Sequence, residues 1–220
     1  MDPRHTRIAE IALEAAGGYG FALAGGYAVS AHGMGRRLSG DVDLFTDWQR
    51  RADFPCAVDA VIAAMRSRGY RVTEVIRNET FARLLLSEDG RSGEDPDKLE
   101  LSADWRAHSP VLLSVGPVLH PDDAVANKMC ALFGRAEARD FLDVDAAVQS
   151  GRYSRERLLE LASAADAGFD RAMFAEALGS LRNITDADFD MYGWAPEELA
   201  GMRDRFADWC AALRAEGTPS

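Results

Sequence analysis

The sequence predicts an α+β fold in which a mixed sheet flanked by helices is followed by a C-terminal helical region. Two observations support this prediction. Strand-like runs with short connections lie before residue 120, at 70–76, 81–86 and 98–104. After residue 120 apolar residues recur at helical spacing, over 122–133, 137–149, 154–165, 170–179 and 195–215. We therefore expect an α/β domain over 1–120 and a helical domain over 121–220, the second completing the site of the first.

The first elements end at pairs of glycines. A helix is expected over 6–16, ending at Gly17-Gly18, and a short buried strand over 21–24. Gly25-Gly26 then precedes a helix over 27–32 that Gly33 closes. A strand, a Gly-Gly turn and a helix start present bare backbone N–H groups, which can hold a phosphate. A tight turn that needs positive φ is the alternative for this pair.

The segment Ser39-Gly40-Asp41-Val42-Asp43-Leu44-Phe45 alternates acidic and apolar residues, which is typical of a strand. Asp41 and Asp43 therefore share one face, and Val42 and Leu44 the other. Two neighbouring carboxylates repel each other unless a cation lies between them. Mg²⁺ is commonly held by one or two carboxylates together with substrate phosphates. The pattern predicts either a metal site or two solvated acids on an exposed strand.

The next segments continue the predicted sheet. A helix over 54–68 precedes the three strands, and a polar loop is expected over 87–97. In the strand over 98–104, Glu100 and Asp104 lie on the polar face, so either could complete a metal site or lie on a solvated outer face. A last extended segment over 111–119 is interrupted by Gly116-Pro117.

Composition limits the classes of function. The net charge of −11 argues against a broad nucleic-acid-binding surface, although a local basic patch remains compatible with it. The sequence has no apolar run of about 18 residues and no signal-peptide pattern, so we expect a cytoplasmic protein without a membrane partner. The three scattered cysteines fit free thiols in a reducing compartment. Only two of the 25 basic residues are lysines, Lys98 and Lys128, so each is more informative than an arginine.

Two blocks of sequence carry a recognisable pattern. The first block combines Gly25-Gly26-Tyr27-Ala28, His32-Gly33, Arg37, Ser39 and Asp41-Val42-Asp43-Leu44-Phe45. The second block runs from Lys128 to Asp143, where a Lys precedes an Ala-Leu pair and an Arg-Asp-Phe-x-Asp sequence. Together the two blocks resemble the AbiEii/AbiGii toxin family of nucleotidyltransferases, within the DNA polymerase β-like superfamily, and the resemblance covers about residues 20–150.

The resemblance implies a nucleotidyltransferase-type sheet and a set of site residues. Mg²⁺ or Mn²⁺ would be held by Asp41, Asp43 and Glu100, with Asp104 as a competing third carboxylate. The triphosphate would be bound by Gly25, Gly26, Arg37, Ser39 and Lys128, and the catalytic set would be Asp41, Asp43, Glu100 and Lys128. Two positions depart from the superfamily's pattern: Gly26 replaces the usual serine, and the third acid is a longer Glu.

The second block can also be examined for helix geometry. On one continuous helix, Lys128, Arg135 and Arg139 fall within about 40° of one another and would form a basic stripe for the β- and γ-phosphates. Gly134 would interrupt that helix. The alternative is a salt-bridged face in which Arg135 or Arg139 pairs with Asp143; the roles of Asp140 and Asp143 stay open. His32 would contact a phosphate or an acceptor, or else cap its helix or pack in the core.

The resemblance implies an enzyme that moves an NMP from an NTP onto an acceptor, as the toxin of a bacterial toxin–antitoxin or abortive-infection system. The acceptor would be tRNA or another RNA, or a protein, and the partner a cognate antitoxin. Two alternatives are open: a small-molecule, aminoglycoside-like nucleotidyltransferase, and a non-catalytic module that binds NTP or a partner on the same fold. The paired acids Asp41 and Asp43 favour the enzyme.

Overall fold

The computed structural model describes residues 1–88 and 95–216. The chain forms two compact units. The first combines Met1–His32 with Leu38–Ala124, and the second combines Gly33–Arg37 with the chain from Val125 onward. The change from sheet to helices therefore lies close to residue 120, and the short segment 33–37 joins the helical unit. That 1–120 and 121–220 fold as separate domains stays a prediction.

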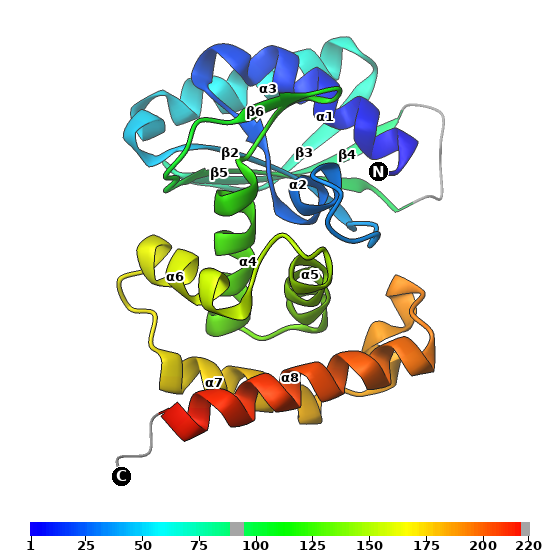
Figure 1. Cartoon of the computed structure of the whole chain (residues 1–220). Coiled ribbons are helices and arrows are strands. Elements are labelled where there is room, and N and C mark those ends of the chain that lie inside the picture. The colour runs from blue at the N-terminus through cyan, green and yellow to red at the C-terminus, as the bar shows by residue number, and fades with distance from the viewer. Residues whose placement is uncertain (89–94, 217–220) are drawn as a thin grey trace. The chain divides into compact units, whose positions relative to one another are not determined.

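The first unit is built on a seven-stranded mixed sheet, ordered β3-β4-β5-β2-β1-β7-β6 (Figure 1). The parallel pairs are β2 with β5 and β1 with β7, and the other neighbours are antiparallel. The fold class predicted from the sequence is thus confirmed. The strands are β1 (Ala22–Leu23), β2 (Asp41–Asp47), β3 (Tyr70–Arg77), β4 (Phe81–Glu88), β5 (Asp97–Asp104), β6 (Val111–Leu113) and β7 (Gly116–Val118).

Helices α1 (Pro3–Ala16) and α3 (Phe54–Ser67) lie side by side on one face of this sheet (Figure 1). Both helices are amphipathic, and their apolar stripes are buried. The strands oppose them with the side chains of alternate residues, which include Val42, Leu44, Leu99 and Leu101, all fully buried. Because side chains alternate along a strand, the residues between these apolar positions point to the other face of the sheet.

The short elements refine the prediction at three places. Helix α2 (Gly25–Ala31) begins at the first glycine of the pair, two residues earlier than expected. The extended segment 111–119 forms a β6–β7 hairpin whose turn is Ser114-Val115, so the predicted interruption at Gly116-Pro117 is wrong by two residues. Two 3-10 helices, η1 (Gly17–Tyr19) and η2 (Trp48–Asp53), complete the unit. Most of the predicted loop 87–97 falls on 89–94, outside the described residues.

The second unit is helical. Its core packs aromatic rings against one another, with Phe141 edge-on to Phe206 and Phe174 edge-on to Trp209. Serine and aspartate caps start two of the helices, as Ser154 and Asp170 accept hydrogen bonds from backbone N–H groups. Its elements are α4 (Pro121–Gly134), which spans the division between the units, α5 (Ala138–Gln149), α6 (Arg155–Ala165), α7 (Arg171–Gly179), η3 (Ser180–Asn183), η4 (Asp186–Tyr192) and α8 (Pro196–Glu216).

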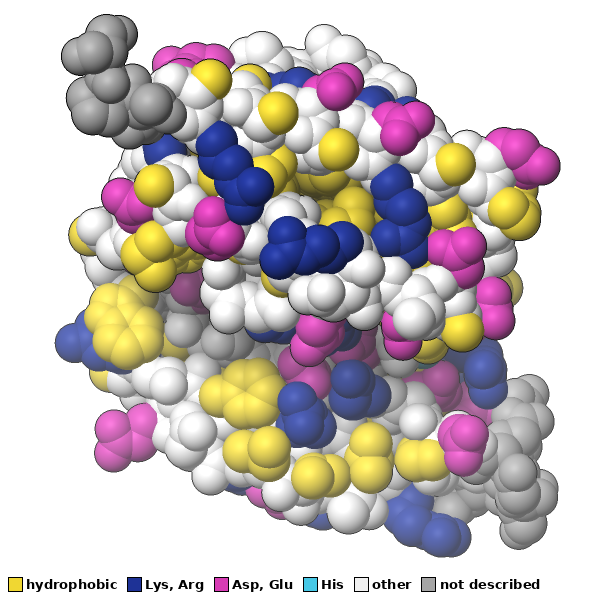
Figure 2. Space-filling view, turned by 90° about the horizontal axis from the view of Figure 1, so that it is seen from below, with side chains coloured by type: hydrophobic (Ala, Val, Ile, Leu, Met, Phe, Trp, Pro, Cys, Tyr) yellow, Lys and Arg dark blue, Asp and Glu magenta, His cyan; other side chains and the backbone are white. Residues whose placement is uncertain are grey.

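The surface carries both signs of charge. On the face shown in Figure 2, Lys and Arg side chains lie among Asp and Glu side chains and apolar groups. Many arginines of the second unit are engaged in ion pairs, such as Arg205 with Asp145 and Arg214 with Glu176. No helix among the described residues is long and apolar enough to span a membrane.

Candidate functional site

Three carboxylates meet on the face of the sheet opposite α1 and α3. The parallel register of β2 and β5 sets Asp43 beside Glu100 and Asp41 beside Lys98. Asp41, Asp43 and Glu100 each offer an oxygen, and these three oxygens lie within 4.8 Å of one another. The strand alternation predicted from the sequence is therefore the cause of the cluster: both acids of β2 point away from the apolar core, and β5 adds the third.

Asp41 is a buried carboxylate with both oxygens engaged. The Ser39 hydroxyl donates to its Oδ1 at 2.9 Å, and the Lys98 ammonium lies 2.8 Å from its Oδ2. Ser39 is itself fixed, because its backbone carbonyl accepts a hydrogen bond from the hydroxyl of Tyr27. Ser39, which the resemblance assigns to nucleotide binding, thus orients a metal-binding candidate in this structure.

Glu100 is held by two basic side chains that the sequence did not identify as site residues. Arg83 lies directly opposite it on β4 and donates from Nε to Oε1 at 2.8 Å. Lys98 lies 3.6 Å from the same oxygen. A signal for Lys98 was present, since it precedes Glu100 by two residues on a strand and so shares its face. Arg83 could be found only from the pairing of β4 with β5.

Asp104 lies outside the carboxylate cluster. It follows Glu100 on the same face of β5, but its partner in register is Asp47, at the far end of β2. Burial raises the pKa of Asp104, and the nearby Asp123 raises it further, against a hydrogen bond from the Trp105 backbone. Of the two alternatives for the third carboxylate, the structure brings Glu100 to the cluster.

Gly25 leaves the space that the Asp43 carboxylate occupies. Its φ is +60°, and a Cβ built on it would lie 1.8 Å from Oδ2 of Asp43. The Ala24 backbone N–H donates to the Asp43 carbonyl, so the turn and the strand are joined at this point. Glycine is therefore required at residue 25 both by backbone conformation and by contact. Gly26 is buried in the first turn of α2.

In the second unit, Asp143 binds two buried cations. Arg37 donates to both of its oxygens, at 2.9 and 2.8 Å, and the Lys128 ammonium lies 2.8 Å from Oδ2. Burial disfavours the charged form of Asp143, but Lys128 and Arg37 outweigh it and hold its pKa below the usual range. Arg37 also lies over the ring of Tyr192. The residue whose role stayed open in the sequence is thus the partner of both Lys128 and Arg37.

The continuous basic stripe predicted for the second block is wrong. Helix α4 ends at Gly134, Ala136 has a φ of +50°, and α5 begins at Ala138, so the three residues do not share one helix face. Arg135 makes a bidentate pair with the buried Asp140, and Arg139 pairs with Glu137. Both arginines therefore pair with acids, as in the alternative of a salt-bridged face, but the acids are Asp140 and Glu137. Asp140 instead forms a capping box with Glu137 at the start of α5.

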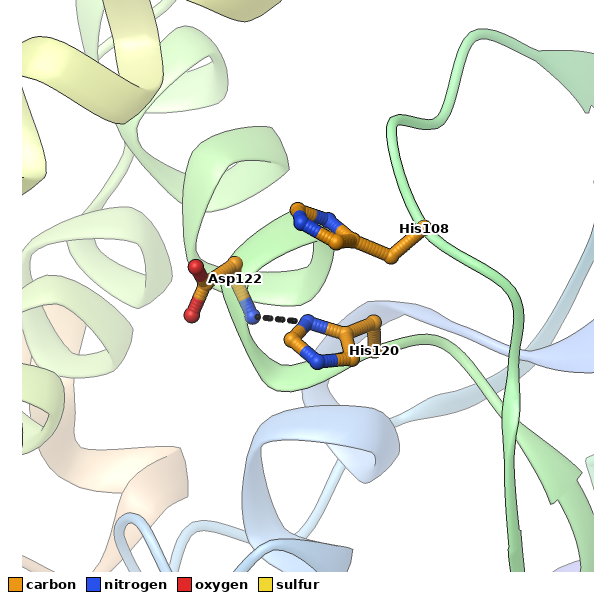
Figure 3. A group of neighbouring side chains, drawn as sticks. All are labelled: His108, His120 and Asp122. Atoms are coloured by element: carbon orange, nitrogen blue, oxygen red, sulfur yellow. Dashed lines mark hydrogen bonds between the residues drawn. The ribbon is translucent and has the colours of Figure 1, made fainter.

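The histidines of the first unit have structural partners. His32 is the C-cap residue of α2, and its Nε2 makes a hydrogen bond of 2.7 Å to the Leu119 carbonyl, so a structural role is favoured. His108 and His120 stack with ring centroids 4.3 Å apart beside Asp122 (Figure 3). His120 Nδ1 accepts the Asp122 backbone N–H, so the lone pair of that nitrogen is already used (Figure 3). This second group of possible ligands is therefore arranged as a stacked pair at the start of α4.

The donor set on β2 and β5 fits a hard divalent cation. Three carboxylate oxygens are the ligand type that Mg²⁺ and Mn²⁺ take, and the described part of the chain adds no sulfur or imidazole ligand to this cluster. Carboxylates gathered this closely need positive charge beside them, which Lys98 and Arg83 supply in this structure.

The mixed sheet and the carboxylates on its central parallel pair define a nucleotidyltransferase-type α+β fold. Solved structures share it: JHP933 from Helicobacter pylori matches with a TM-score of 0.65 at 17% identity, over 97% of this chain and 91% of that one. MenT4, a nucleotidyltransferase toxin from Mycobacterium tuberculosis, matches with a TM-score of 0.57 at 15% identity, over 94% and 83%. None of the curated proteins matches the sequence.

The sequence then places the chain in one family. Residues 9–191 match the family model described as nucleotidyl transferase AbiEii toxin, type IV toxin–antitoxin system. The chain therefore belongs to the AbiEii family of nucleotidyltransferase toxins, and the resemblance seen in its two sequence blocks is confirmed.

Proposed function

We propose that this chain is a divalent-metal-dependent nucleotidyltransferase that moves an NMP from an NTP onto an acceptor, and that it is the toxin of a toxin–antitoxin pair. The observation that carries the proposal is the meeting of Asp41, Asp43 and Glu100 on one face of β2 and β5. Family membership supports the reaction class and the toxin role. The metal, the acceptor and the antitoxin belong to the proposal.

The reaction forms a bond between an acceptor oxygen and the α-phosphorus, and it breaks the bond between that phosphorus and the oxygen bridging to the β-phosphate. Pyrophosphate leaves with the electron pair. Divalent cations, when bound, stabilise the charge on the attacking and leaving oxygens. Asp41, Asp43 and Glu100 would hold them, and Ser39 keeps the Asp41 carboxylate oriented. Glu100 would also orient the acceptor hydroxyl and accept its proton.

The sequence assigns the phosphates to Gly25, Gly26, Arg37, Ser39 and Lys128, with Arg135 and Arg139 as further cations. Among these residues we retain Lys128 as the principal phosphate ligand. Its position is fixed by Asp143, which also binds Arg37. Arg37 is buried in a bidentate pair, so we expect it to act mainly by holding Asp143 in place. Arg135 and Arg139 are partnered by Asp140 and Glu137, which weakens their assignment.

The test is transfer of label from α-³²P NTPs, offered one at a time with Mg²⁺, to total cellular RNA, to total protein and to a small-molecule extract. We expect label in RNA or protein, and a loss of about a hundredfold to a thousandfold in Asp43→Asn, because removing one transition-state stabiliser typically costs about 10²–10³ in rate. Label in the small-molecule fraction would instead support the aminoglycoside-like alternative. NTP binding without transfer to any fraction would support the non-catalytic module.

A matched pair of variants tests the third carboxylate. Glu100→Gln and Asp104→Asn each neutralise one acid on the same face of β5. Only the first removes a member of the cluster, so we expect Glu100→Gln to lose transfer and Asp104→Asn to retain it. Loss in Asp104→Asn with retention in Glu100→Gln would reverse the assignment.

The toxin role is tested in cells. Induced expression of the wild-type chain should arrest growth, and Asp43→Asn should not. Co-expression of a gene adjacent to the toxin gene should restore growth. Unimpaired growth under strong expression would remove the toxin role and leave the enzymatic proposal in place.

A further inference from the structure

Lys98 lies among the carboxylates at the position where a cation is required. Its Nζ is 2.8 Å from Asp41 Oδ2 and 3.6 Å from Glu100 Oε1. Lys98 and Glu100 are two residues apart on β5, so their side chains leave the strand on the same face, and the register places Lys98 directly beside Asp41.

We propose that Lys98 is the internal counter-ion of this cluster and competes with a divalent cation for Asp41. The inference rests on the function proposed above. Lys98 and Arg83 offset part of the formal charge of −3 that Asp41, Asp43 and Glu100 carry together. A divalent cation is therefore attracted less strongly to the free protein than to the three acids alone.

The two basic residues differ in how readily they can leave. Arg83 lies opposite Glu100 in the antiparallel register of β4 and β5 and donates to it in a short hydrogen bond. Both side chains are partly exposed, at 32% for Lys98 and 37% for Arg83, but the Lys98 ammonium is carried on a flexible four-carbon stem, whereas the Arg83 guanidinium is planar and rigid. When a metal arrives, the Lys98 ammonium can therefore leave Asp41 and turn into solvent, while Arg83 stays with Glu100.

A functional consequence follows for metal loading. The free protein should bind Mn²⁺ or Mg²⁺ weakly, and an NTP should strengthen metal binding because its phosphates supply additional oxygen ligands and negative charge. Lys98 would thus keep the acids paired in the absence of substrate and make metal loading depend on the nucleotide.

The experiment titrates Mn²⁺ into nucleotide-free protein and follows the EPR signal of free Mn²⁺. Lys98→Met, which keeps the length and removes the charge, should bind Mn²⁺ about tenfold or more tightly than wild type. Lys98→Arg, which keeps the charge, should remain weak. Arg68→Gln removes one positive charge of the same unit from an exposed pair with Glu14 and should change affinity less than about twofold.

Folding of the variants is controlled in two ways. Lys98→Gln is a second neutral variant that can still donate to Asp41, and it should also bind Mn²⁺ more tightly than wild type. Mn²⁺ should raise the melting temperature of both neutral variants more than that of wild type, since a ligand that binds only the native state stabilises it by mass action. Unchanged or weaker Mn²⁺ affinity in the folded neutral variants would overturn the role of Lys98.

Asp43→Asn separates the two proposals. If Asp43→Asn abolishes Mn²⁺ binding both alone and combined with Lys98→Met, the metal site stands. The comparison of the Lys98 variants then decides the inference. If no variant binds Mn²⁺ with or without each of the four NTPs, or if Asp43→Asn leaves binding intact, the proposed metal site fails and the inference fails with it.

Discussion

At the scale of single residues, the candidate site depends on one missing side chain. Gly25 has a positive φ, and the Asp43 carboxylate occupies the place of its absent Cβ. We expect Gly25→Ala to lower transfer more than about tenfold, because the carboxylate must move, and to destabilise the fold by roughly 1–2 kcal/mol from backbone strain. Transfer assays and thermal melts of the purified variant measure the two effects.

The matched control is Gly69→Ala. Gly69 also has a positive φ, of +87°, but nothing lies within 4 Å of a Cβ built on it. It should show a similar loss of stability with transfer activity retained. Equal transfer activity in the two variants would contradict the argument that Gly25 makes room for Asp43.

For Asp104 we predict that removing the charge stabilises the fold. Because burial raises its folded-state pKa above the unfolded value, ionisation of this carboxyl destabilises the fold increasingly as the pH rises above the unfolded pKa, and the penalty is complete above the folded pKa. Below its ordinary pKa of about 3.9 the penalty disappears. Asp104→Asn, whose amide oxygen can still accept the Trp105 N–H, should therefore raise the melting temperature at pH 7 and give no gain near pH 3. A lower melting temperature at pH 7 would contradict this sign.

At the scale of elements, periodicity predicted the strands and helices because each buries one face. The alternation in 41–45 and in 98–104 was enough to place Asp41 and Asp43 on one face and Glu100 on a polar face. The alternation cannot decide between Glu100 and Asp104 as the third carboxylate, because both residues lie on the same face of the strand. The register of β2 with β5 decides that choice, and register depends on long-range packing.

The break between α4 and α5 is a second place where periodicity alone does not give the geometry. Gly134 signalled an interruption, and the Glu137-x-x-Asp140 spacing is a helix-start signal that fits the observed capping box. Because the helix is broken here, Arg135 and Arg139 do not share a helix face with Lys128. What replaces the predicted basic stripe is the ion triad of Arg37, Lys128 and Asp143, which joins three segments distant in sequence.

That triad predicts an acid-sensitive second unit. The folded-state pKa of Asp143 is depressed, so its stabilisation is complete above its ordinary pKa and is lost as the pH falls through the lower folded value. Asp143→Asn at pH 7 leaves two buried cations unpaired and should cost about 3–5 kcal/mol. Urea unfolding at pH 7 and near pH 3 should show this difference shrinking in acid.

The control for this experiment is Asp208→Asn, an exposed acid on α8 of the same unit. It should change stability by less than about 0.5 kcal/mol at either pH. If Asp143→Asn matches this control at pH 7, the triad does not stabilise the second unit.

At the scale of the whole molecule, charge limits how an RNA acceptor can be held. The chain carries −11, and residues 151–220 contribute eight Arg against thirteen Asp and Glu, a balance of −5. The charges of both signs are mixed on the face in Figure 2. A long RNA footprint needs many phosphate contacts, so we expect an RNA acceptor to be bound by its end alone.

This expectation gives a salt dependence that can be measured. For single-stranded RNA the logarithm of the binding constant falls with the logarithm of salt concentration by about 0.7 per phosphate contact. An end held by two or three contacts gives a slope of magnitude about 2, whereas six or more contacts give a slope above about 4. The slope is measured by filter binding of the labelled RNA acceptor to Asp43→Asn at salt concentrations between about 50 and 200 mM. A slope above about 4 would show that the RNA meets an extended basic surface, which the charge balance of this chain argues against.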